Sequence, residues 1–201
     1  RADEAAEETA PPRREVRLRA PLFDPAERRL SPAEAGTAHH LFMQFCDFAE
    51  AEKPGGVARE LARLAARGIL SEKQAAAVKI PRIEAFFASE LYRGLMKNAK
   101  VRREFKFSVL VPASRYFPAA ESEPEENVLL QGVIDCLIET EDGYVILDFK
   151  TDRVSERTLP ERAESYRAQL DAYAAAVREI CGGTVLGSIL YFFQTGTVWE
   201  M

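Results

Sequence analysis

The sequence predicts an α/β fold in which a mixed central sheet is flanked by helices and preceded by a helical N-terminal part. Apolar residues recur at helical spacing up to about residue 97 and alternate as in strands from residue 101 onward. The expected order after that point is three strands, a long helix and a further strand, which is typical of α/β proteins. The length of 201 residues corresponds to one domain, or to one domain with an appended arm.

Residues 1–30 differ in composition from the rest of the chain. They are mainly Ala, Glu, Pro and Arg, and they show no apolar periodicity. Such a segment cannot bury enough surface to offset the entropy lost on ordering, so we expect a linker or docking arm here and the folded domain over 31–201. The chain starts at Arg1, without an initiator methionine or a signal-peptide pattern, and we expect it to be a segment of a longer protein.

The helical part begins at Ser31-Pro32, an N-cap followed by proline at the first helical position. The pattern predicts a helix to about Glu52, with an apolar stripe formed by Leu41, Phe45 and Phe48. Gly55-Gly56 ends this helix. Further helices are predicted over 57–67, 72–79 and 81–97.

The strands follow. Residues 101–111 alternate, and one face is apolar: Phe105, Phe107, Val109 and Val111. The acidic stretch 112–127 predicts a loop. Strands are predicted over 128–139 and 144–150, joined by Thr140-Glu141-Asp142-Gly143, because Asp-Gly between apolar runs favours a hairpin. A helix over 160–181, ended by Gly182-Gly183, and a strand over 184–194 complete the prediction.

Composition excludes several classes of protein. No apolar run reaches the roughly 18 residues of a membrane helix, so we expect no membrane association. Three widely spaced cysteines (Cys46, Cys136 and Cys181) cannot alone form a disulfide framework, a zinc site or a four-cysteine cluster; we expect small buried residues in a reducing compartment. A net charge of −5 argues against coating nucleic acid by bulk electrostatics. A local basic track remains, either a solvated edge or a nucleic-acid contact: Arg93, Lys97, Lys100, Arg102, Arg103 and Lys106.

Three charged residues stand out in the hairpin. The strand over 128–139 is apolar on both faces, as in a central strand covered on both sides, so Asp135 is costly there unless it is paired or binds a cation. Asp148 and Lys150 lie two apart and share a face. If Glu141-Asp142 is the turn, Asp135 lies opposite Asp148; if Asp142-Gly143 is the turn, it lies opposite Lys150. Either register brings the three within roughly 4.5–8 Å of one another.

This convergence has two interpretations. A buried ion pair without function leaves one carboxylate unpaired, whereas a hard divalent ion such as Mg²⁺ would supply the missing positive charge. We therefore expect a metal site. His40 borders the apolar face of the first helix, beside the small residues Gly36 and Thr37, while His39 points elsewhere. In the last helix one face carries Tyr166, Gln169, Leu170, Tyr173 and Val177. Taken alone, the histidine and this helix face are each explained better by packing than by function.

Together these residues resemble a known family. Gly36-Thr37-x-x-His40, Gly132-x-x-Asp135, Asp148-x-Lys150 and Gln169-x-x-x-Tyr173 occur in the order and spacing of the RecB-like branch of the PD-(D/E)XK nucleases. Residues 131–154 look most like the C-terminal nuclease domain of AddA-type helicase–nuclease subunits, and the resemblance covers about 31–195. It implies a restriction-endonuclease-like (PD-(D/E)XK) core. The site residues that it implies are the metal ligands His40, Asp135, Asp148 and the Phe149 carbonyl, the catalytic Lys150, Gln169 and Tyr173 for organising the site and contacting DNA, and Glu104 at an upstream acidic position.

The resemblance also implies a function. The expected activity is Mg²⁺-dependent exonuclease hydrolysis of single-stranded DNA, with Mn²⁺ as an alternative in vitro and 3′-to-5′ polarity by family analogy, in double-strand-break repair by homologous recombination. The expected partners are N-terminal helicase domains of the same full-length chain, because these residues contain no P-loop, and an AddB-like second subunit, in the bacterial cytoplasm at the nucleoid. The cysteine cluster of iron–sulfur relatives is absent, so we expect no iron–sulfur cluster. The alternatives are a non-cutting DNA-binding or assembly module and a metal-dependent phosphatase acting on small esters.

Overall fold

A five-stranded mixed sheet forms the centre of the molecule. The computed structural model describes residues 30–115 and 126–201. The strands lie side by side in sequence order: β1 (Lys100–Pro112), β2 (Asn127–Glu139), β3 (Tyr144–Lys150), β4 (Val185–Phe192) and β5 (Thr197–Glu200). Neighbouring strands are antiparallel except for β3 and β4, which are parallel because helices connect them across one face. The predicted α/β class with a mixed sheet is confirmed.

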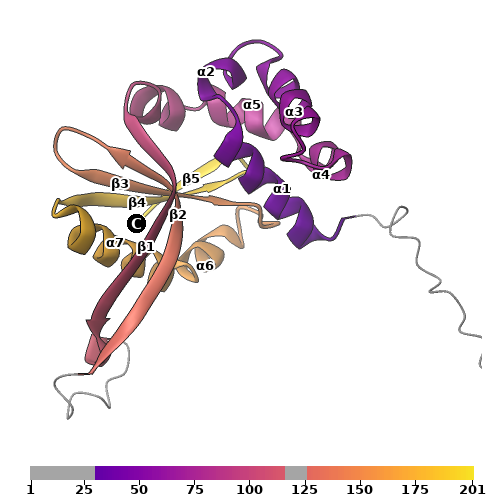
Figure 1. Ribbon diagram of the computed structural model, residues 1–201. Coiled ribbons are helices and arrows are strands. Elements are labelled where there is room, and N and C mark those ends of the chain that lie inside the picture. The colour runs from indigo at the N-terminus through magenta and orange to yellow at the C-terminus, as the bar shows by residue number, and fades with distance from the viewer. Residues whose placement is uncertain (1–29, 116–125) are drawn as a thin grey trace, which may run out of the picture.

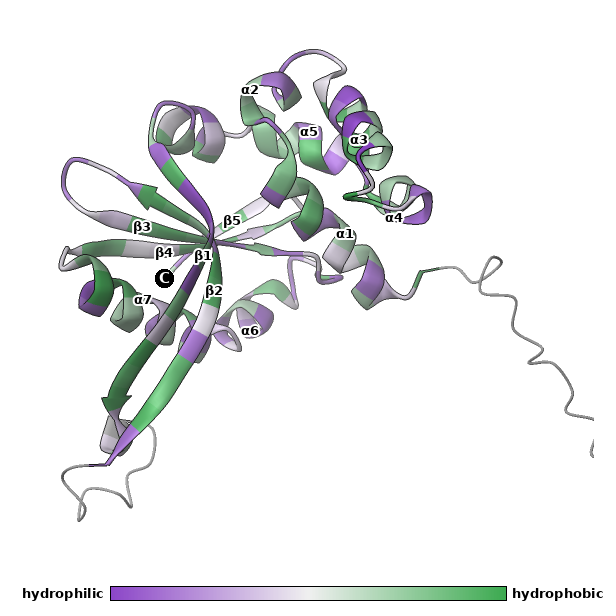
Figure 2. Ribbon diagram, in the orientation of Figure 1, coloured by the Kyte–Doolittle hydropathy of each residue, from purple (hydrophilic) through white to green (hydrophobic). Residues whose placement is uncertain are grey.

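Helices cover both faces of this sheet (Figure 1). One face packs against the N-terminal helical part, which comprises α1 (Pro32–Phe45), α2 (Phe48–Ala51), α3 (Gly56–Ala66), α4 (Glu72–Ala77), α5 (Ile80–Ala88) and the π-helical segment Leu91–Met96. The other face packs against α6 (Leu159–Glu164) and α7 (Arg167–Cys181). Figure 2 shows hydrophobic residues along β3 and along the outer half of β1, where these two cores meet the sheet. None of the described helices combines the length and apolar character needed to cross a bilayer.

The first helix is shorter than predicted. It ends at Phe45, and α2 begins after Asp47, whose carboxylate accepts hydrogen bonds from the Ala49 and Glu50 amides. The predicted apolar stripe treats two helices as one and is wrong for Phe45, whereas Leu41 and Phe48 pack against the core. Phe45 is 42% exposed, and the buried face of α1 instead carries Gly36, Ala38, His39, Phe42 and Met43. His39 is thus a core histidine: its ring contacts the Ala35 carbonyl and accepts a hydrogen bond from the Lys79 amide.

Two other predicted helices are also interrupted. The helix predicted over 81–97 divides into α5 and the π-helical segment, with Ser89 between them. The helix predicted over 160–181 divides into α6 and α7, with Ser165 and Tyr166 at the junction. The final strand β5 was not predicted; it returns antiparallel beside β4 and carries Trp199.

The hairpin between β2 and β3 selects one of the two predicted registers. The Thr140 amide donates to the Gly143 carbonyl, so Glu141-Asp142 forms the two-residue turn, and Cys136 lies opposite Leu147. The expectation that β2 is covered on both faces holds for Ile134–Ile138 but is wrong for its outer half, where Leu129 is 58% exposed. The predicted arm and the centre of the predicted acidic loop fall in residues 1–29 and 116–125, which lie outside the described residues.

Candidate active site

Asp135 lies inside β2, at the point where the ladder between β2 and β3 stops. The last paired residues are Cys136 and Leu147, one position before Asp135 would meet Asp148. Asp135 Oδ2 accepts a hydrogen bond of 2.7 Å from the Phe149 amide, in place of a backbone partner. Its Oδ1 lies 3.2 Å from His40 Nδ1, which comes from α1. The Asp135 carboxylate therefore joins the α1 layer to the sheet.

Asp148 and Lys150 form a buried ion pair on the next strand. Lys150 Nζ lies 2.6 Å from Asp148 Oδ2, and the two side chains are 10% and 6% exposed. Burial, and then the neighbouring charge of Asp135, raise the pKa of Asp148 above its usual value. The ion pair lacks hydrogen-bond geometry, so within the described part of the chain Asp148 Oδ2 has no hydrogen-bond partner. A buried carboxylate oxygen needs a cation beside it, and here the Lys150 ammonium is that cation.

Helix α7 holds the lysine from the other side. Lys150 Nζ donates to Gln169 Oε1 at 3.1 Å, and Gln169 Nε2 donates to the Tyr173 hydroxyl at 2.7 Å. Burial raises the pKa of Tyr173 to about 12, so its phenol stays protonated at neutral pH. The two residues of the Gln169-x-x-x-Tyr173 motif therefore act as one unit directed at the ammonium.

Two glycines allow the surrounding elements to approach one another. A β-carbon on Gly132 would lie 2.5 Å from a Phe107 ring atom and 3.2 Å from the Tyr173 ring. A β-carbon on Gly36 would lie 2.7 Å from Thr151 Oγ1, which follows Lys150. Gly36 thus lets α1 come close enough for His40 to contact Asp135.

The electrostatics of His40 depend on that contact. Burial by itself lowers the pKa of the imidazole, but the hydrogen bond and charge of Asp135 outweigh it and raise the pKa above 6.5. The structure places His40 beside one of the predicted carboxylates, that of Asp135. As the side chains stand, His40 is a partner of Asp135, and binding to a metal ion would require it to lose its proton.

Glu104 lies at an irregular point of β1. The pairing of β1 with β2 places it across from Asp135, where the ladder skips one pair, and its φ of 51° is in the left-handed region. Burial, and then the charge of Asp135, raise the pKa of its carboxyl. Strained, partly desolvated positions of this kind are concentrated at functional sites.

A cavity of about 370 Å³ collects these groups. Its lining includes all of the predicted residues except Glu104: His40, Asp135, Asp148, Phe149, Lys150, Gln169 and Tyr173. The Phe149 ring is buried in the core of the N-terminal helical part, so only its backbone is directed to the site. Four further lining residues were not predicted as site residues: Val133, Thr151, Asp152 and Tyr166. The signal for Tyr166 was its place on the same face of the last predicted helix as Gln169 and Tyr173.

The donor set fits a hard divalent ion, although the side chains are arranged for one another. Among the residues the structure describes, no three His, Cys, Asp or Glu side chains stand together as a ready metal cluster. Lys150 instead provides the positive charge beside Asp148, and His40, when protonated, provides it beside Asp135. Two carboxylates on one face, one with an oxygen that lacks a hydrogen bond, are the ligands that Mg²⁺ prefers.

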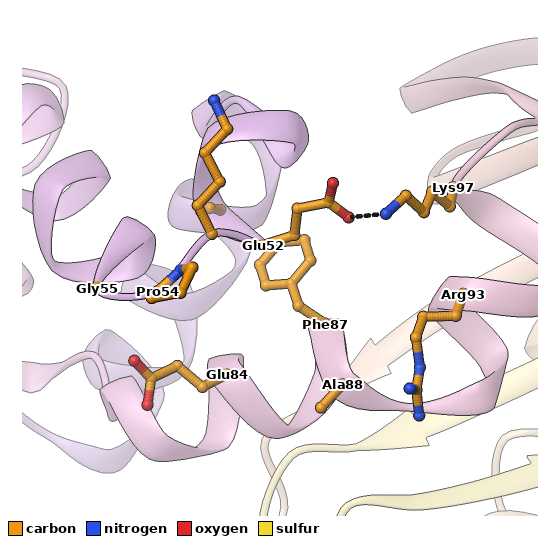
Figure 3. Close-up of a pocket in the computed structure, with 10 residues that line it drawn as sticks. Glu52, Pro54, Gly55, Glu84, Phe87, Ala88, Arg93 and Lys97 are labelled. Atoms are coloured by element: carbon orange, nitrogen blue, oxygen red, sulfur yellow. Dashed lines mark ion pairs between the residues drawn. The ribbon is translucent and has the colours of Figure 1, made fainter.

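The basic track contributes little to this cavity. Lys97 pairs with Glu52, and Lys100 and Arg102 pair with Glu139. The Arg103 guanidinium donates to backbone carbonyls of the α1–α2 junction. Figure 3 shows the Glu52–Lys97 pair in a separate cavity of about 560 Å³, none of whose lining residues belongs to the site. These contacts favour a solvated edge over a nucleic-acid contact.

Comparison with known proteins decides the family. A model of the PD-(D/E)XK nuclease superfamily matches residues 13–198. The chain belongs to the PD-(D/E)XK nuclease superfamily. The mixed sheet flanked by helices is the restriction-endonuclease-like fold of that superfamily, whose members generally use divalent metal ions.

Curated relatives are similar to this PD-(D/E)XK chain over most of its length. The chain is 41% identical to an ATP-dependent helicase/nuclease subunit of Pelotomaculum thermopropionicum over 88% of its residues, and 38% identical to the corresponding protein of Desulforudis audaxviator over 94%. It covers only 14% and 15% of the length of these two relatives.

Proposed function

We propose that this chain is a Mg²⁺-dependent deoxyribonuclease that hydrolyses phosphodiester bonds of single-stranded DNA. The observation that carries the proposal is the convergence of Asp135, Asp148 and Lys150 in one cavity, where Asp148 Oδ2 is ion-paired with Lys150 but has no hydrogen-bond partner among the described residues. Two carboxylates and a lysine match the chemistry of phosphodiester hydrolysis, which needs a cation at the phosphate and a positioned water molecule.

Asp135 and Asp148 would hold the metal ion, with His40 and the Phe149 carbonyl as further ligands and Glu104 as a nearby acidic group. Once bound, Mg²⁺, or Mn²⁺ in vitro, would neutralise the scissile phosphate and lower the pKa of a water molecule. No iron–sulfur cluster is part of this proposal.

The chain's own residues supply the rest of the mechanism. The Lys150 ammonium, held by Gln169, orients the attacking water and stabilises the negative charge that develops on the phosphate in the transition state. Tyr173 fixes the Gln169 amide, so that its carbonyl oxygen faces the ammonium. Cleavage would leave a 5′-phosphate and a 3′-hydroxyl.

The relatives suggest the wider setting. Their name, which describes one subunit of an ATP-dependent helicase/nuclease, supports a helicase in a longer chain, since the 201 residues here contain no P-loop. In this proposal the helicase feeds single-stranded DNA to the nuclease, which works as a 3′-to-5′ exonuclease beside an AddB-like subunit. The setting would be recombinational repair of double-strand breaks at the bacterial nucleoid, in the cytoplasm.

The test is a cleavage assay with end-labelled single-stranded DNA and Mg²⁺. Wild-type chain, Asp148→Ala and Asp142→Asn are compared, with an EDTA control; Asp142 is an exposed turn residue and serves as the matched control. We expect metal-dependent cleavage by wild type and Asp142→Asn and none by Asp148→Ala. Cleavage by Asp148→Ala at the parental rate would refute the assignment. Binding of DNA without cleavage by any of the proteins would favour the non-cutting module instead.

A further inference from the structure

The junction between α6 and α7 places an aromatic ring over the site lysine. Tyr166 is the N-cap residue of α7, with φ −96° and ψ −4°, and its ring is half-buried at the cavity. Lys150 Nζ lies 3.6 Å from the centroid of this ring. An ammonium at that distance from a ring face is within the range of a cation–π interaction.

The ring is fixed from behind by an ion-paired carboxylate. The Tyr166 hydroxyl donates to Asp152 Oδ2 at 2.8 Å, and burial together with this bond raises the pKa of Tyr166 to about 12, so the phenol keeps its proton. The Arg162 guanidinium donates to Asp152 Oδ1 through Nε at 2.9 Å and through a terminal nitrogen at 2.5 Å. Arg162 also lies over the same ring, with its central carbon 4.9 Å from the centroid.

These contacts define the role of Asp152. Its position two residues after Lys150 would suggest a third acidic metal ligand, but both of its oxygens already accept hydrogen bonds from Tyr166 and Arg162. Asp148, by contrast, has an oxygen without a hydrogen-bond partner in the described residues. The two carboxylates therefore differ in availability, and only Asp148 is free to exchange its neighbour.

We propose that Tyr166 is a positioning residue that holds the Lys150 ammonium at the reacting phosphate through its ring face, with Asp152 and Arg162 fixing the ring. This inference rests on the proposed function and adds to it. With a metal ion held by Asp148, the contacts that would hold the Lys150 ammonium among the described residues are those with Gln169 and the Tyr166 ring. Because a lysine stem is long and flexible, the ring then restricts its rotamers.

The first test is steady-state cleavage kinetics with Tyr166→Leu, Tyr166→Phe and Asp152→Asn. We expect kcat of Tyr166→Leu to fall about tenfold, with KM within about twofold of wild type, because the contact acts on the reacting group. Tyr166→Phe keeps the ring but removes its hydrogen bond to Asp152, and Asp152→Asn weakens the same hydrogen bond. We therefore expect kcat of each variant to fall about threefold. The variant that combines Tyr166→Phe with Asp152→Asn should lose no more than either single one, because both changes break the same contact.

A tyrosine and a carboxylate on β3 and β2, outside the cavity, serve as matched controls for Tyr166 and Asp152. Tyr144 is a half-buried tyrosine at the start of β3, with the Arg102 guanidinium 5.9 Å from its ring centroid, and Glu139 is a carboxylate that pairs with two basic residues. Tyr144→Leu and Glu139→Gln should leave kcat unchanged. Equal values of kcat for Tyr166→Leu and Tyr166→Phe would overturn the role of the ring. If Asp152→Asn needed a tenfold higher Mg²⁺ concentration for half-maximal activity, Asp152 would be a metal ligand, and its proposed role in fixing the Tyr166 ring would be refuted.

A second test does not need activity. In chain labelled with ¹³C at lysine Cε, the ring current of Tyr166 should shift the Lys150 methylene protons upfield; Lys150→Met identifies the signal. The shift should disappear in Tyr166→Leu and persist in Tyr166→Phe. An unshifted signal in wild type would refute the positioning role even if DNA is cleaved. A shifted signal in a chain that does not cleave DNA would refute the proposed function and leave the contact established. If Tyr166→Leu does not fold, Tyr166→Phe and Asp152→Asn carry the kinetic test.

Discussion

Replacing Asp148 by asparagine should remove most of the stabilisation that a divalent metal ion gives to the folded chain. Asp135 and Asp148 lie on the adjacent strands β2 and β3, and the Asp148 side chain is 6% exposed, so a bound cation there is poorly screened by water. The unfolded chain does not hold the two carboxylates together. Binding therefore favours the folded state and raises the melting temperature, Tm.

The size of this effect follows from binding linkage. At about one hundred times its Kd, Mg²⁺ adds about 2.7 kcal/mol to the free energy of unfolding. Since 1 kcal/mol corresponds to roughly 2–4 °C for a chain of this length, Tm of wild type should rise by about 5–11 °C. The attraction between the metal ion and the Asp148 carboxylate is about 4 kcal/mol for unit charges about 4 Å apart at an effective dielectric constant near 20. Metal binding would also break the Asp148–Lys150 ion pair, and this loss offsets part of that attraction.

A net loss of about 2.7 kcal/mol in Asp148→Asn corresponds to a Kd roughly a hundredfold higher. At the same Mg²⁺ concentration the variant should then gain only about 0.4 kcal/mol, or roughly 1–2 °C. The assay is thermal unfolding followed by circular dichroism, in EDTA and in a Mg²⁺ series, with Asp142→Asn as the control that keeps the full shift. An equal rise of Tm in Asp148→Asn and wild type would refute the assignment of the metal to this carboxylate.

Three further predictions concern packing and pH. Gly132→Ala should lower the free energy of unfolding by about 1–3 kcal/mol in urea titration, because its β-carbon would lie 2.5 Å from the buried Phe107 ring; an unchanged midpoint would contradict this contact. Gly36→Ala should cost about 1 kcal/mol and reduce cleavage by pushing α1 from the sheet, and adding Thr151→Ala should restore both; failure of the double variant to recover would locate the strain elsewhere. Without metal, the raised pKa of Asp148 means that the folded state retains its proton longer, so wild-type stability falls as the pH rises from 3.8 through that pKa. The unfolding free energy of Asp148→Asn minus that of wild type should therefore increase over that window, and a decrease would reverse the sign of the inferred shift.

The hairpin that carries the site could be predicted from sequence because its constraints are local. Residues at alternate positions share a face, and a two-residue turn leaves only two registers, both of which bring Asp135 to Asp148 and Lys150. Sequence could not choose between them, since Asp-Gly favours a turn at Asp142-Gly143, whereas Gly143 pairs with Thr140 outside the turn. That choice depends on how β3 meets the rest of the sheet. The backbone of Gly143 itself lies close to the Thr184 carbonyl at the start of β4.

The helix interruptions could not be predicted in the same way, and one of them forms the part of the site that was missed. Hydrophobic periodicity reports which residues face the core, and Leu159, Ala163 and Leu170 all pack in the same cluster although the helix breaks between them. A break that leaves the core pattern intact is invisible to periodicity. It changes only the direction of polar side chains at the junction, and here it directs Tyr166 toward both Lys150 and Asp152.

Gln169, a residue of the family motif, and Tyr166, which lies outside the motif, are positioned in the site by different features of the structure. Motif residues such as Gln169 lie inside a regular helix, where their spacing alone places them on one face. Helical spacing also put Tyr166 on this face, but Tyr166 lies at the helix end, so its contact with Lys150 depends in addition on the junction and on the Asp152–Arg162 pair that fixes it. A change in the length of the α6–α7 junction should therefore affect Lys150 through Tyr166 while leaving the Gln169–Tyr173 hydrogen bond in place. The ring over the lysine is a property of the tertiary structure, and the kinetic comparison of Tyr166→Leu with Tyr166→Phe measures it directly.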